Sequence, residues 1–259
     1  MKKQLVIDHA DIVVTHECPN RCPFCIDKFI NTSKDVVSYK AVYSFLYRVA
    51  NVAEKGMEVL LLGGEPTSVG VVKLRVIATI IHDFGFSPII STNTRDKNMW
   101  VQLTEIFDWV QITVHSKADI DFLRPYRKNV NIKIAGDKTF CMARLRSFAD
   151  DTRDFERKSV SMYFTPDFKE LCTDEEVWNL LDTLEWERNG SYLYAFHNGI
   201  RFKRCISGET NIIDEPTVPK LYPNGNYNKT WCNEEMDDYL PFVFRMGSQG
   251  TSSYMPYQK

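Results

Sequence analysis

Short apolar runs alternate with longer segments of helical periodicity along the first two thirds of the chain. The apolar runs are four to six residues long and are bounded by polar or glycine-containing turns, which is typical of buried strands. Strands that alternate with helices predict parallel βαβ units. The predicted strands are Ala10–Thr15, Met57–Leu62, Pro88–Ser91, Trp109–Val114, Val130–Ile134 and Ser159–Phe164.

Helical periodicity occupies most of the segments between these strands. Ser38 is a predicted N-cap, and apolar residues recur at helical spacing after it until Gly56, where we expect the helix to stop. A second helix is predicted over Val71–Phe84, with a stripe that includes Val72 and Val76 as its apolar face. Shorter helices are predicted at Met99–Ile106 and Thr139–Phe148.

The last third of the chain has a different pattern. Thr173-Asp174-Glu175-Glu176 has the sequence of a capping box and predicts a helix that Gly190 ends. His197-Asn198-Gly199 lies between two apolar runs, and Asn-Gly in that position indicates a β-hairpin. We therefore predict a core at residues 1–172 and a C-terminal extension with a helix and a hairpin at residues 173–259.

Charge and hydropathy exclude several kinds of partner. The net charge of the 259 residues is −2, which gives no general attraction to nucleic acid or to a membrane surface. The N-terminus has two lysines but lacks the apolar core of a signal peptide, and no apolar run approaches the roughly 18 residues of a membrane helix. We expect a cytoplasmic protein without a membrane or nucleic-acid partner.

Three of the seven cysteines lie within eight residues. Cys18, Cys22 and Cys25 have the spacing C-x3-C-x2-C, with Phe24 before the last cysteine. Three thiolates can hold three irons of a [4Fe–4S] cluster and leave the fourth iron open to a small molecule. A zinc site and free thiols remain as alternatives, although structural zinc usually has four ligands, typically in two C-x2-C pairs. The odd number of cysteines argues against a disulfide framework.

This segment resembles the cluster loop of the radical S-adenosylmethionine (radical SAM) superfamily, whose signature is C-x3-C-x2-C with an aromatic residue before the third cysteine. Gly63-Gly64-Glu65-Pro66 begins 38 residues after Cys25 and resembles the GGEP motif of the same superfamily. The resemblance implies an α/β fold, a partial (β/α)6 TIM-like barrel over roughly residues 8–170. The periodicity alone leaves a doubly wound sheet open.

Other candidate residues follow the predicted strands at their carboxyl ends, where α/β enzymes place their chemistry. The resemblance implies that the GGEP-like segment binds the amino group of SAM, and that the polar residues after the third and fourth strands approach its methionine or ribose. Each group also has a structural interpretation, as a glycine turn, a polar loop or a structural histidine. Lys133 matches the family's adenine-contact segment only loosely and is also explained as a solvated residue. The candidate SAM-binding residues are Phe24, Gly63, Gly64, Glu65, Pro66, Ser91, Asn93, Thr113 and His115.

The resemblance also implies the reaction. An electron donor such as flavodoxin or ferredoxin reduces the cluster, SAM is cleaved, and the resulting 5′-deoxyadenosyl radical takes a hydrogen atom from a substrate. Tyr222-Pro223-Asn224-Gly225, together with Cys205 and Cys232, resembles the start of the SPASM and twitch extensions, which hold auxiliary clusters in peptide- and sugar-modifying relatives. Only four cysteines lie outside the main motif, so two further full clusters are excluded. A cluster-free remnant and one second iron–sulfur cluster both remain open.

Three functional hypotheses follow from these observations. The first is a radical SAM enzyme that modifies a peptide or protein, because of the SPASM-like segment. The second is the same chemistry on a small metabolite, sugar or nucleotide. The third is a non-catalytic iron–sulfur or zinc-binding scaffold, in which Gly63 to Pro66 would have no purpose. The residues that act on the substrate are not identified by the motifs.

Overall fold

The computed structural model describes residues 9–20, 34–136, 140–162, 174–189, 192–205 and 219–228. Over these ranges the strands form one sheet in the order β11-β10-β1-β2-β3-β4-β5-β6-β9-β8-β7. The six strands β1 to β6 are parallel and adjacent in chain order. Their bounds are His9–Thr15 (β1), Glu58–Gly63 (β2), Ser87–Ser91 (β3), Trp109–Thr113 (β4), Val130–Gly136 (β5) and Arg157–Met162 (β6). The predicted parallel sheet is therefore confirmed.

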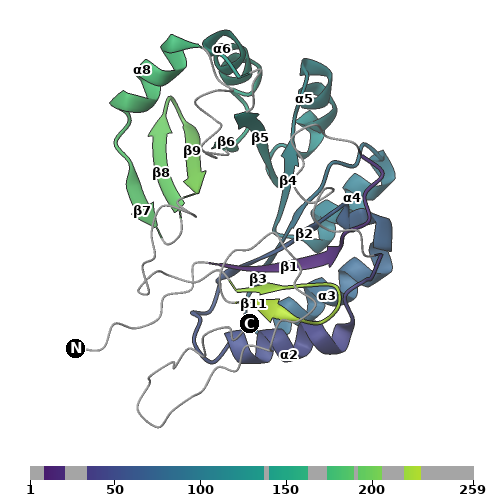
Figure 1. Ribbon diagram of the computed structural model, residues 1–259. Coiled ribbons are helices and arrows are strands. Elements are labelled where there is room, and N and C mark those ends of the chain that lie inside the picture. The colour runs from purple at the N-terminus through teal and green to yellow at the C-terminus, as the bar shows by residue number, and fades with distance from the viewer. Residues whose placement is uncertain are drawn as a thin grey trace, which may run out of the picture.

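Helices follow the strands and cover one side of the sheet. Figure 1 shows the sheet curving, with α2 to α6 along its outer side. The order of β1 to β6 contains no reversal of the kind that defines a doubly wound sheet. The helices are α2 (Tyr39–Val49), α3 (Val71–Asp83), α4 (Lys97–Ile106), α5 (Lys117–Leu123), α6 (Met142–Asp151) and α8 (Glu175–Thr183).

The core lies between this outer face of the sheet and the helices. Alternate residues of β1, such as Ile12 and Val14, are fully buried and belong to the same cluster as Phe45 and Leu46 of α2. The remaining strand positions point to the opposite, concave face, because side chains alternate along a strand. The concave face therefore carries the residues that the core does not use, and many of them are polar.

Two helix predictions were wrong in detail. Ser38 is the N-cap of α2, as expected, but the helix ends at Val49 and Gly56 lies in the following turn with φ of +82°. In α3 the buried residues are Leu74, Ile77, Ala78 and Ile81, whereas Val72 is 74% exposed. This helix has two apolar stripes, and the stripe that carries the larger Leu and Ile side chains faces the sheet.

Helix α5 and the two short strands that flank Pro223 were not predicted from the sequence. Helix α5 begins after Ser116, whose side chain accepts a hydrogen bond from the backbone N–H of Asp119 in a capping box. Strand β10 (Lys220–Leu221) runs parallel to β1 at the sheet edge, and β11 (Tyr227–Asn228) pairs with it antiparallel. The turn between these two strands is closed by the Gly225 N–H, which donates to the carbonyl oxygen of Tyr222 at 3.0 Å.

The C-terminal strands continue the main sheet. β9 (Ile200–Cys205) is parallel to β6 and antiparallel to β8 (Tyr192–His197), which in turn pairs with β7 (Glu187–Asn189). Helix α8 begins after Asp174, whose carboxylate accepts from the Glu176 N–H at 2.9 Å, and it ends at Thr183, before the predicted stop at Gly190. None of the helices in the described ranges is long and apolar enough to cross a membrane.

Candidate functional site

The carboxyl ends of β1, β2, β3 and β4 lie at one edge of the sheet, because these neighbouring strands are parallel. The chain reaches Cys18 three residues after the end of β1, and the Cys18 side chain is half-buried. The GGEP-like segment follows β2, the polar segment Ser91–Asn93 follows β3, and His115 follows β4. The fold therefore brings the described members of the predicted site to one edge, whereas Cys22, Phe24 and Cys25 lie outside the described residues.

Gly63 and Gly64 let the end of β2 lie directly against the chain that leads to Cys18. Gly63 has φ of +130°, and a Cβ there would lie 2.3 Å from the carbonyl oxygen of Thr15. A Cβ on Gly64 would lie 2.3 Å from the carbonyl oxygen of Glu17. The Gly64 N–H donates to the Thr15 oxygen at 2.7 Å, and the Glu65 N–H donates to the Glu17 oxygen at 2.8 Å. Only glycine permits this approach at both positions.

The Glu65 carboxylate joins the loops after β2 and β3. It is 4% exposed. Oε1 accepts hydrogen bonds from the Thr67 N–H at 3.1 Å, from the Thr67 hydroxyl at 2.8 Å and from the Thr92 hydroxyl at 2.5 Å, while Oε2 accepts from the Asn93 N–H at 2.8 Å. Buried carboxylates require such donors, since desolvation opposes their charge. Glu65 therefore has a structural function that the sequence analysis did not predict.

An Arg95–Asp119 pair joins the loop after β3 to the first turn of α5. Arg95 Nε donates to Asp119 Oδ1 at 2.8 Å, and the guanidinium also donates to the carbonyl oxygens of Asn93 and Thr113. Asp119 Oδ2 accepts from the backbone N–H of His115 at 2.8 Å. Burial opposes the charge of Asp119, but the hydrogen bonds from Arg95 and His115 outweigh it and lower the pKa of this carboxyl.

Glu65 and the Arg95–Asp119 pair thus form a continuous set of contacts across three loops. Of the predicted residues, Pro66 is buried, Ser91, Asn93 and Thr113 are half-buried, and His115 is exposed. Thr92, Arg95 and Asp119 were not among the predicted site residues. A Ser-x-x-Asp capping signal at Ser116–Asp119 was available in the sequence, but no local pattern pairs Arg95 with Asp119 across 24 positions.

Lys133 lies on the concave face, between Thr113 of β4 and Ser159 of β6 in the strand register. Its neighbours Ile132 and Ile134 are buried in the core on the other face. The interpretation of Lys133 as a solvated residue was wrong, because its side chain is partly buried and burial lowers its pKa from 10.5 to about 8.

The lowered pKa of Lys133 predicts a pH-dependent stability. The unfolded chain binds more protons than the folded chain between pH 8 and pH 10.5, so the free energy of unfolding should rise with pH in this window, by about 3 kcal/mol. Lys133→Met should remove this rise, as measured by urea unfolding at the two pH values. Lys128→Met, at an exposed position shortly before β5, is the control. Equal pH dependence in Lys133→Met and the unmodified chain would contradict the prediction.

Two observations bear on the predicted cluster: the chemistry of its three thiolate ligands and the glycine backbone beside the residues before Cys18. Three thiolates are soft donors suited to an iron–sulfur cluster, and the glycine backbone of Gly63 and Gly64 lies against the residues before Cys18 without side chains in between. Among the described residues no three His, Cys, Asp or Glu side chains converge as metal ligands, and two of the three predicted cysteines lie outside those residues. Of the three predicted ligands, the described residues place only Cys18, which lies in the loop after β1 beside this glycine backbone.

Comparisons with known proteins gave structural matches only. No family model matches the chain, and no curated protein matches it in sequence. Among solved structures, the anaerobic sulfatase-maturating enzyme anSMEcpe, a radical SAM enzyme with bound AdoMet, matches with a TM-score of 0.49 and 14% identity, over 61% of this chain and 51% of that chain. Its complex with AdoMet and the Cp18Cys peptide matches with a TM-score of 0.45 and 16% identity, over 61% of this chain and 50% of that one. The chain spans about half the length of these structures.

Proposed function

We propose that this chain is a radical SAM enzyme with a partial (β/α)6 barrel, in which Cys18, Cys22 and Cys25 hold a [4Fe–4S] cluster. The observation that carries the proposal is the contact between the GGEP-like segment and the residues that lead into the cysteine motif. Gly64 and Glu65 of the GGEP-like segment donate backbone hydrogen bonds to Thr15 and Glu17, directly before the first cysteine. The GGEP-like segment, which begins 38 residues after Cys25, therefore lies beside the residues directly before Cys18.

The chain's own residues would hold SAM beside the cluster. Glycine backbone at Gly63 and Gly64 allows close approach of a ligand, and the carboxylate of Glu65, polarised by Thr92 and Asn93, provides negative charge for the amino group of SAM. When bound, the cluster supplies one electron for the cleavage of SAM, which yields the radical that abstracts hydrogen from the substrate. Ser91, Thr113 and His115, at the ends of β3 and β4, are the proposed contacts to the remainder of SAM.

The enclosure needed by such a reaction would come from the loops joined by Glu65 and Arg95. A reactive intermediate requires the exclusion of water and a fixed distance to the substrate. Loops held by charged hydrogen bonds at this edge are suited to both tasks, since they are ordered before the substrate arrives.

The first experiment measures cluster content and SAM cleavage in the same preparation. After anaerobic reconstitution with iron and sulfide, we expect about four irons per chain at the cubic cluster. Addition of SAM and dithionite should release 5′-deoxyadenosine. A preparation that holds the full cluster and releases no 5′-deoxyadenosine would contradict the proposal and favour the non-catalytic scaffold.

The substrate class is part of the proposal. We propose a peptide or protein, because Tyr222 to Gly225 and Cys232 resemble the start of a SPASM extension. The assignment of residues 173–259 as an extension, and of a second cluster to it, remains a prediction; Cys232 lies outside the described residues. Peptides, nucleotides and sugars should be compared for their ability to raise the release of 5′-deoxyadenosine above the uncoupled rate. Stimulation by nucleotides or sugars alone would favour a small-molecule substrate.

A further inference from the structure

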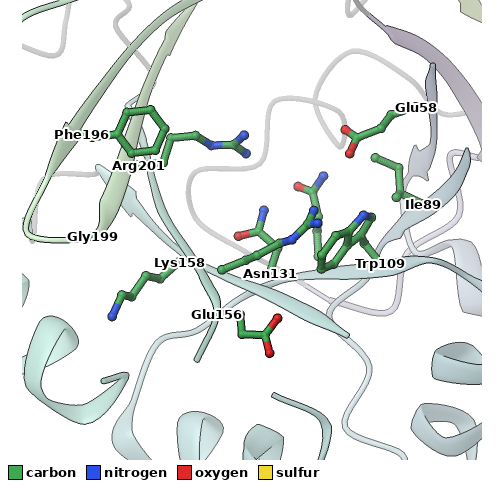
Figure 2. A pocket seen from close by; sticks show the side chains of 11 residues that line it. Glu58, Ile89, Trp109, Asn131, Glu156, Lys158, Phe196, Gly199 and Arg201 are labelled. Atoms are coloured by element: carbon green, nitrogen blue, oxygen red, sulfur yellow. The ribbon is translucent and has the colours of Figure 1, made fainter. Parts of the chain in front are cut away.

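A cavity lies on the concave face of the sheet. It is near the amino ends of the strands, whereas the candidate SAM site is at their carboxyl ends. Its volume is about 240 Å³, and β2, β3, β4, β5, β6 and β9 contribute to its lining. Figure 2 shows the amide of Asn131 and the ring of Trp109 on one side of this space, with Arg201 and Phe196 on another and Glu58 across from Arg201. Among the described residues, neither Cys18 nor the GGEP-like segment lines it.

Two guanidinium groups line this cavity from neighbouring strands. Ser159 of β6 is in register with Arg201 of β9, so Arg157, two residues earlier in β6, lies on the same face diagonally across from Arg201. Arg157 stacks on the ring of Trp109, and Arg201 lies 5.4 Å from the ring centroid of Tyr194. In the part of the chain that the structure describes, neither guanidinium has a carboxylate in ion-pair distance.

The charges of Glu58 and Glu156 compensate this positive charge only in part, since neither carboxylate forms an ion pair with Arg157 or Arg201 among the described residues. In Figure 2 the Glu156 carboxylate points away from Arg201, and Lys158 points to the other side of the sheet, where its Nζ donates to the carbonyl oxygen of Thr152 at 3.3 Å. Burial lowers the pKa of Arg157, and the charge of Arg201 lowers it further, whereas the charges of Glu58 and Glu156 raise it; the net shift is downward. Two like charges on adjacent strands are destabilising unless an anion lies between them.

We propose that this cavity binds a small organic anion whose carboxylate or phosphate group lies between Arg157 and Arg201. The planar fork of arginine matches both groups and is selected where such anions are bound. The amides of Gln111 and Asn131 supply further hydrogen-bond donors, and the exposed ring of Phe196 offers an apolar surface to the rest of the ligand. Glu58 disfavours a second negative group at the opposite end of the cavity, which selects for ligands charged at one end.

The test is titration calorimetry on the full chain at constant ionic strength. The probes are phenyl phosphate, phenylacetate and the neutral benzyl alcohol. We expect saturable binding of at least one anion and none of benzyl alcohol, and the tighter anion identifies the headgroup class. Arg201→Gln should raise its Kd about tenfold or more, the loss expected for a hydrogen bond to a charged group.

Two further variants control for the loss of a positive charge and for a loss of folding. Arg153→Gln, at an 80% exposed side chain that pairs with Asp150 outside the cavity, should leave the Kd unchanged. Arg201→Lys retains the charge but loses the fork, so it should weaken binding without loss of fold if Arg201→Gln is unstable. Absence of saturable binding to the unmodified chain, or equal affinity in Arg201→Gln and Arg153→Gln, would overturn the proposal. The assay requires neither iron nor SAM, so its result is independent of the proposed radical chemistry.

Discussion

Cys18→Ala is expected to abolish the release of 5′-deoxyadenosine from SAM. Under the proposed function, the variant leaves two thiolates for a cluster that needs three, and such a cluster is lost or incomplete. Iron per chain after reconstitution should fall from about four to near zero. The measurements are iron and sulfide content, followed by chromatography of the nucleoside products after reduction.

Cys141→Ala is the matched control for this change. Cys141 is also half-buried, but it is the N-cap residue of α6, in the connection that follows β5 and not in the loop after β1. The control should retain both iron and activity. If about four irons remain in Cys18→Ala, the remaining cysteines hold a cluster elsewhere, and the second-cluster hypothesis for Cys205 and Cys232 becomes the better explanation. If Cys18→Ala retains activity as well, the assignment of the cysteine motif is wrong.

The presence of six parallel strands could be predicted from the sequence because the signal for each strand is local. Apolar runs such as Trp109–Thr113 are short and bounded, and each is buried on one face by the next helix. The choice between two apolar stripes in α3 could not be made in this way, since Val72 and Leu74 have similar hydropathy and only the packing against the sheet distinguishes them.

The candidate site was only partly predictable, because its motifs are local in the sequence whereas its side-chain contacts are not. Gly63 and Gly64 were identified by their motif. The structure explains why both are glycine, because a Cβ at either position would collide with the backbone of Thr15 or Glu17. The pairing of Arg95 with Asp119 and the proposed anion cavity both depend on side chains from elements far apart in the sequence. Arg157 and Arg201 become neighbours only because β9 returns to pair with β6, and nothing near either residue in the sequence indicates that pairing.

Glu65 holds two loops together and is also the residue proposed to bind the amino group of SAM. The family resemblance implies that its carboxylate binds the amino group of SAM. In the structure the same carboxylate accepts four hydrogen bonds from protein donors. A carboxylate has about four lone-pair sites on its two oxygens, and three of the donors share Oε1. Oε2 has the Asn93 N–H as its donor in these contacts and retains capacity for a ligand amine.

Glu65→Gln is therefore expected to reduce both stability and SAM binding. The amide nitrogen must face either the Asn93 N–H or the donors from Thr67 and Thr92, which places donor against donor in a site that is 4% exposed. The free energy of unfolding should fall by about 2–3 kcal/mol, the cost of one unsatisfied buried group and the loss of a charged hydrogen bond. Urea unfolding measures this change, and Glu105→Gln, at an exposed position of α4, should be neutral.

The two functions of Glu65 can be separated by comparing stability with SAM affinity. Thr92→Val removes one donor to Oε1 but leaves the carboxylate and its Oε2 intact, so it should lower stability while SAM affinity stays close to that of the unmodified chain. Glu65→Gln should lower both, because it removes the charge that the amino group of SAM requires. If the two variants lose SAM affinity in proportion to their loss of stability, the carboxylate acts only by holding the loops after β2 and β3. If Glu65→Gln alone weakens SAM binding, the same buried carboxylate both orders the loops and contacts the ligand, because its two oxygens face different partners.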